Sequence, residues 1–110
     1  LSLKAKNPGK RINLLTPAED ATLNADQAFI FSWIDMQGVT MYQFEVESSA
    51  EETPQIILTS MIKPGISQYV APPWLSDNAG NQLRWRVRAL ANNGSVLSVT
   101  QWRNFIIGEQ

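Results

Sequence analysis

The stretch QLRWRVRALA, residues 82–91, carries the clearest strand pattern of this chain. Its three arginines, Arg84, Arg86 and Arg88, alternate with apolar side chains that include Trp85 and Val87. A period of two places the arginines on one face of an extended strand and the apolar residues on the other, whereas a helix would scatter the arginines around its circumference. The stretch therefore predicts a central strand of an antiparallel sheet, with one face in a core and the other in water.

Length and composition place this strand in a single globular domain. The chain has 110 residues, which is enough for one hydrophobic core but not for two. A hydrophobic fraction of 44% is typical of a folded domain, and a formal net charge of −1 gives no overall field that would attract nucleic acid. No apolar run approaches the roughly 20 residues of a membrane-spanning helix. We therefore expect no nucleic-acid partner and no membrane-spanning segment.

Two residue types are missing, and their absence bears on chemistry. The chain has no cysteine and no histidine, so it lacks thiolate ligands, the commonest general base and the commonest metal ligand. Glu51-Glu52 and Asp77-Asn78 could offer oxygen ligands to calcium, but neither pair shows the ligand spacing of a calcium loop. We expect no enzyme, no catalytic residue, no metal and no cofactor.

The rest of the chain reads as further strands separated by turn signals. Alternating apolar residues at 29, 31 and 33 and at 42, 44 and 46 predict two more half-buried strands, and the Asn-Asn-Gly sequence at 92–94 predicts a tight hairpin. The expected strands are residues 12–15 with a continuation at 22–23, 29–34, 42–48, 55–62, 66–70, 82–91 and 96–107. Several strands and no amphipathic helix predict an all-β fold, an antiparallel β-sandwich of about seven strands.

The N-terminal segment, residues 1–11, differs from the rest in charge. It contains four basic residues and no acidic one. We expect a basic linker or tail that leads into a domain at residues 12–108, with binding to an anionic surface as the alternative.

Three segments in this order carry a resemblance to a known family. Residues 31–33 (FSW), 38–42 (GVTMY) and 85–89 (WRVRA) resemble the fibronectin type III-like, immunoglobulin-like modules of bacterial extracytoplasmic proteins, and residues 14–18 and 102–106 resemble their first and last strands. The resemblance implies an extracytoplasmic location: periplasm, cell surface or secreted. These modules usually carry a tyrosine near the start of the sixth strand, where this chain has Leu83. Either Leu83 packs there, or the connection at 74–75 closes that corner instead.

The arginines of residues 82–91 form one candidate binding patch, because guanidinium groups bind anions in a bidentate way. In the implied topology, however, Glu45 and Glu47 face the three arginines across one ladder, and Trp102 lies near them from the opposite side. This predicts that the patch is neutralised within the fold.

Trp74 is the second candidate, because two prolines stiffen the loop that presents it. Such an indole is suited to bind a sugar or a protein, but in many sandwich modules this connection closes the bottom of the core instead. Trp102 is the other tryptophan that a carbohydrate-binding module could use.

The function expected from these features is that of a non-catalytic binding or spacer module that mediates protein–protein interaction in an envelope or secreted protein. The partner would be another protein or neighbouring domains of the same chain. The alternatives are a carbohydrate-binding module, or an accessory domain of a larger catalytic chain. The surface separates them: a row of exposed aromatic residues favours sugar, an exposed apolar face or edge favours protein, and satisfied charges favour a spacer.

Overall fold

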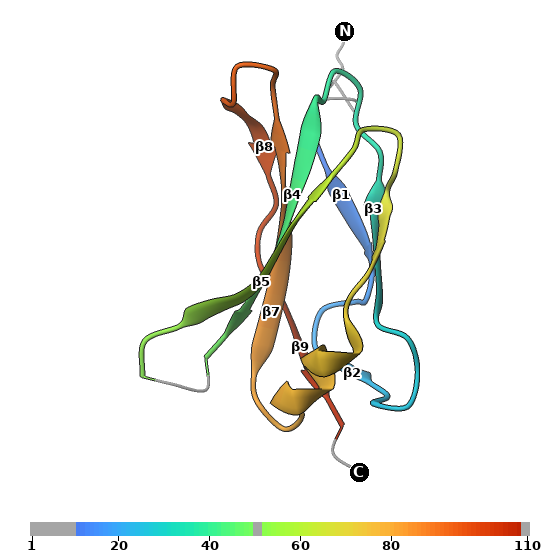
Figure 1. Cartoon of the computed structure of the whole chain (residues 1–110), viewed down its shortest axis with the longest axis vertical. Coiled ribbons are helices and arrows are strands. Elements are labelled where there is room, and N and C mark those ends of the chain that lie inside the picture. The colour runs from blue at the N-terminus through green and yellow to red at the C-terminus, as the bar shows by residue number, and fades with distance from the viewer. Residues whose placement is uncertain (1–10, 50–51, 109–110) are drawn as a thin grey trace, which may run out of the picture.

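The computed structural model describes residues 11–49 and 52–108, which form two facing sheets and one short helix (Figure 1). The predicted basic segment lies outside these residues except for Arg11, which is exposed. The elements, in chain order, are β1 (Asn13–Thr16), β2 (Ala21–Leu23), β3 (Ile30–Ile34), β4 (Met41–Ser48), β5 (Gln55–Ile62), β6 (Gln68–Val70), the 3-10 helix η2 (Pro73–Asn78), β7 (Leu83–Leu90), β8 (Val96–Val99) and β9 (Arg103–Ile107).

The prediction of an all-β fold is confirmed, but the prediction of a purely antiparallel sandwich is wrong at one edge. The smaller sheet has the order β1-β3-β6, and the larger has the order β2-β9-β7-β4-β5, with β8 also paired to β7. In the larger sheet β2 runs parallel to β9. The chain leaves β1 at the Thr16–Pro17 bond, crosses to the other sheet and continues beside the last strand, where the N–H of Asp20 donates to the carbonyl of Asn104 at 2.8 Å.

Two expected strands are each divided in the structure, so the described residues contain nine strands. The first is split between the two sheets as β1 and β2. The last is broken into β8 and β9 around Thr100, although both pieces pair with β7. At the break the N–H of Val87 donates to the hydroxyl of Thr100 at 3.2 Å. A side-chain oxygen thus accepts a hydrogen bond at the place where the regular ladder is interrupted.

The core lies under β7, as the opening stretch predicts. Its inward residues Leu83, Trp85, Val87 and Ala89 are fully buried. The Trp85 ring lies 5.1 Å from that of Phe31 across the sandwich, with the ring planes at 66°. Such edge-to-face contacts join the two sheets and contribute about 0.5–1.5 kcal/mol beyond the area they bury.

The corner at the start of β7 contains no tyrosine, and Leu83 packs there in the core. Leu75 of η2 is also fully buried, so the connection helps to close this end of the sandwich. A different tyrosine anchors a loop elsewhere: the hydroxyl of Tyr42 accepts a hydrogen bond from the N–H of Met36 at 2.7 Å and donates one to Asp35. Burial, followed by the bond to Asp35, raises the pKa of Tyr42 to about 12.

Candidate interaction surfaces

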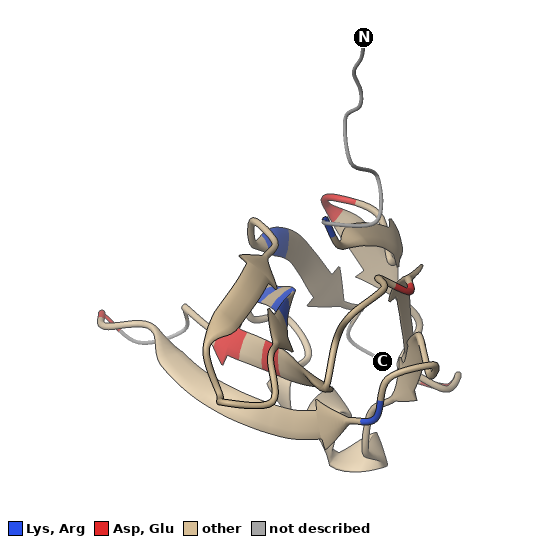
Figure 2. Ribbon diagram, turned by 90° about the horizontal axis from the view of Figure 1, so that it is seen from above, with Lys and Arg blue, Asp and Glu red and all other residues tan. Residues whose placement is uncertain are grey.

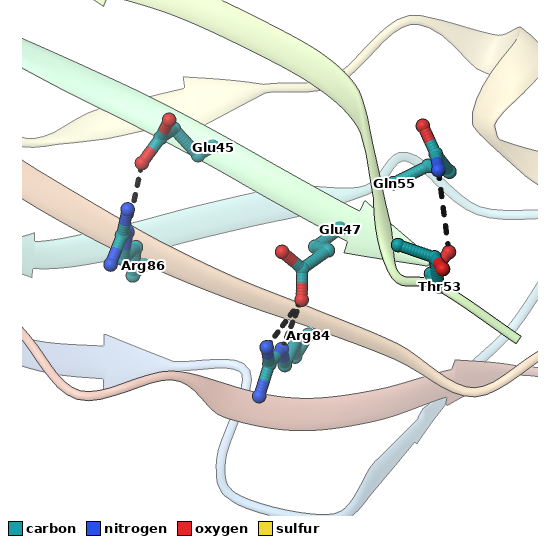
Figure 3. A network of polar contacts seen from close by, with 6 residues as sticks. All are labelled: Glu45, Glu47, Thr53, Gln55, Arg84 and Arg86. Atoms are coloured by element: carbon teal, nitrogen blue, oxygen red, sulfur yellow. Dashed lines mark hydrogen bonds and ion pairs between the residues drawn. The ribbon is translucent and has the colours of Figure 1, made fainter. Parts of the chain in front are cut away.

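The arginines predicted as a binding patch project from β7 beside acidic residues of β4. The antiparallel register places Glu45 opposite Arg86 and Glu47 opposite Arg84. Figure 3 shows these side chains reaching across the ladder. Arg86 Nε donates to Glu45 Oε1 at 2.8 Å, and Arg84 Nε donates to Glu47 Oε1 at 2.6 Å. The predicted neutralisation is confirmed for two of the three arginines.

Trp102, in the connection between β8 and β9, completes this arrangement. Its ring lies 4.3 Å from the guanidinium carbon of Arg86 and 4.7 Å from that of Arg84. Each guanidinium therefore contacts both a carboxylate and an indole. We call Glu45, Glu47, Arg84, Arg86 and Trp102 the charged ladder. Glu45 is only 7% exposed, so its ion pair with Arg86 lies mostly within the fold, and we assign the charged ladder a structural role.

Arg88 departs from the expectation that acidic residues face all three arginines. It lies opposite Gln43 of β4 and Val99 of β8, and no ion pair joins it to another of the residues that the structure describes. The register of β4 and β7 places Gln43, two residues before Glu45 on the same face, opposite Arg88, and the Gln43 side chain is an amide rather than a carboxylate. A single half-buried guanidinium does not provide the bidentate cluster that would favour a strong anion site.

Trp74 lies in η2 and keeps 45% of its surface exposed, while its neighbour Leu75 fills the core. The two candidate tryptophans do not come together. Trp102 is half-buried against the arginines, and no ring contact joins it to Trp74 within residues 11–49 and 52–108. The structure thus shows one exposed indole rather than a row of them.

The outer face of the smaller sheet is a surface that sequence reasoning missed. Ile30 of β3 and Val70 of β6 lie directly opposite each other and are 44% and 54% exposed. Ile34 lies further along β3, and Ile66 lies just before β6; both are 49% exposed. We call these four residues the apolar face. No residue of β1, β3 or β6 is charged, so these strands are tan along their whole length in Figure 2.

A signal for the apolar face was present in the sequence. Residues 30 and 34 are isoleucines that interleave with the aromatic residues of the same strand. A strand that is apolar on both parities indicates either burial on both sides or an exposed apolar face, and alternation alone does not separate the two.

A groove of about 730 Å3 lies between β1 and the segment that joins β8 to β9. Two of the three charged side chains that line it, Arg103 and Glu19, are hydrogen-bonded within the fold, whereas the third, Arg11, is exposed. Arg103 donates to the carbonyls of Leu14, Leu15 and Pro17 at 3.0–3.1 Å. The backbone N–H and side-chain amide of Asn104 donate to Glu19 and hold the pKa of that carboxyl below its ordinary value. These bonds join β9 to the crossing segment, and we assign the groove a structural role.

The described residues contain no cluster of three or more acidic side chains placed to hold a metal ion. Among the same residues, no helix has the length and apolarity needed to cross a membrane. Comparison with known proteins gives no match: no protein-family model, no curated protein and no solved structure is significantly similar to this chain.

Proposed function

We propose that this chain is a non-catalytic β-sandwich module that binds another protein, or a neighbouring domain of its own chain, through the apolar face. The observation that carries the proposal is the exposure of four aliphatic side chains, each close to half exposed, on a sheet whose strands have no charge. Burying such a surface against a protein removes apolar area from water.

Two features favour this function over its alternatives. A carbohydrate-binding module commonly presents several exposed aromatic rings, whereas Trp102 is engaged by two arginines. In a pure spacer, the exposed groups would have partners within the domain, as the charged groups of the charged ladder do. The side chains of the apolar face have no such partners among the described residues. An accessory domain of a catalytic chain would use the same face, with the neighbouring domain as its partner.

The order of the strands supports a sandwich of the fibronectin type III-like kind, which is part of the proposal. Three strands, β1-β3-β6, face a sheet in which β5, β4, β7 and β9 follow one another. The extracytoplasmic location that the resemblance implies belongs to the same proposal.

Photo-crosslinking in the producing cell tests the proposal. A photoreactive phenylalanine derivative replaces Val70 in the full-length gene product, and we expect an adduct of discrete mass after irradiation. Adding Ile30→Lys should abolish that adduct, because the lysine lies directly opposite position 70. The same probe at Asn93, at the exposed tip of the β7–β8 hairpin, is the control. No adduct from position 70, or an identical one from position 93, would contradict the proposal.

A further inference from the structure

The free edge of β5 differs from every other exposed strand edge of the sandwich. β5 ends the larger sheet and pairs on one side only, with β4. It has eight residues, whereas β1, β2, β6 and β8, the other strands with an open side, have three or four. Within residues 11–49 and 52–108, no strand covers the other side of β5. Its outward N–H and C=O groups therefore form the longest open template for an added strand.

A β-bulge at Ile57 interrupts the register of β5 with β4, so the regular part of the strand runs from Leu58 to Ile62. β5 lacks the other features that usually protect such an edge. Its sequence, QIILTSMI, contains no charged residue and no proline, and most of its residues favour extended structure. Ile56 and Met61 point to the outer face and are 46% and 51% exposed. Pro54 and Pro64 lie just outside the strand, where they limit the length of an added ladder without blocking it.

We propose that the β5 edge pairs with β5 of a second copy of this chain, which joins the two larger sheets into one continuous sheet. A two-fold axis makes this pairing antiparallel. With Ser60 at the axis, Leu58 lies opposite Ile62 of the other copy and Thr59 lies opposite Met61. Both pairs keep each residue on its own face, because Leu58 and Ile62 point to the core and Thr59 and Met61 point outward.

The occupant is a second copy because the edge is uncharged and self-complementary. An isologous interface brings identical strands together, so a charged residue on β5 would lie near the same charge of the other copy and repel it. β5 has no charged residue. The nearest acidic side chain on the outer face, Glu45 opposite Thr59, is already paired with Arg86. Each copy has one long open edge, so the pairing closes at two copies and does not continue into a fibre.

Analytical ultracentrifugation of the 110-residue chain between about 1 μM and 1 mM tests this pairing, with dissociation constants in this range typical of modest interfaces. We expect a reversible monomer–dimer equilibrium. Thr59→Lys should raise its dissociation constant by about tenfold or more, because two lysines then lie on either side of the axis within a Debye length of each other. Thr22→Lys, the same exchange in the short edge strand β2, is the matched control and should leave the dissociation constant unchanged.

Amide hydrogen exchange supplies a second readout that does not depend on a variant. Amides of β5 should become more protected as concentration rises, whereas those of β2 and β6 should not change. A chain that stays monomeric at 1 mM, or a dimer that Thr59→Lys does not weaken, would overturn the proposal. A dimer weakened by Ile30→Lys instead would also overturn it, and would assign self-association to the apolar face.

Discussion

The two sheets of this protein differ in the charge on their outer faces, although the larger sheet also exposes Ile56 and Met61 of β5. The larger sheet carries arginines and glutamates that pair with each other and with an indole. The smaller sheet carries half-exposed aliphatic residues and no charge on its strands. The sequence predicts a binding patch at the arginines and treats the isoleucines as ordinary strand residues. In the structure two of the arginines are already paired, whereas the isoleucines on the outer face are exposed.

Among substitutions outside the hydrophobic core, Arg86→Ala should have the largest effect on stability, and Arg88→Ala is its matched control on the same strand. Removing Arg86 leaves the carboxylate of Glu45 nearly buried without its ion pair, which should lower the free energy of unfolding by about 2 kcal/mol. Arg88 has no such partner among the described residues, so its loss should stay within about 0.5 kcal/mol. Urea denaturation measures both. Equal losses would mean that the charged ladder does not stabilise the fold.

Tyr42→Phe should lower stability by about 1 kcal/mol at neutral pH, since the hydroxyl bonds Met36 and Asp35. The raised pKa adds a pH dependence. The folded state favours the neutral phenol, so this contribution is complete below pH 10, the ordinary phenol value, and is lost as pH rises toward about 12. Chemical denaturation at several alkaline pH values should show a decline that is smaller in the phenylalanine variant. The same decline in both proteins would contradict this assignment.

Trp102→Ala should cost about 1 kcal/mol through loss of its contacts with the two guanidinium groups. Trp102→Phe keeps an aromatic face and should recover part of that loss. Thermal unfolding of the two variants separates the cation–π contribution from simple loss of a large side chain. If alanine and phenylalanine were equivalent, the indole would contribute nothing specific to the ladder.

Ile30→Ser should have an effect as small as that of Arg88→Ala, within about 0.5 kcal/mol, because the side chain is close to half exposed and has no covering element among the described residues. Phe31→Ala, at the next residue on the inner face, should cost about 3–5 kcal/mol. The contrast between adjacent positions tests whether the apolar face is a true surface. The measurement is made on the dilute chain without a partner, because a bound partner would cover the apolar face. Under these conditions a loss of stability for Ile30→Ser as large as that for Phe31→Ala would show that the face is already covered in the isolated chain.

Much of the fold follows from local pattern, but the connections do not. Alternation at residues 83–89 identifies the inner residues of β7, and the pairing of Glu45 and Glu47 with two arginines follows once the strands are neighbours. Where the chain changes sheets near Pro17 depends on contacts far apart in sequence, such as the bond from Asp20 to Asn104. The parallel ladder of β2 and β9 was therefore outside the reach of local reasoning.

The candidate surfaces divide in the same way. The order of the amino acids shows which residues share a face, because the side-chain period of a strand is a local property of the backbone. Which face is covered, which charge has a partner and which edge remains open depend on contacts between segments far apart in the chain. Register places Gln43 rather than an acid beside Arg88, sheet order leaves β5 at an edge, and no described element lies over the apolar face. Burial and pairing are properties of neighbours, and the neighbours are set by the fold.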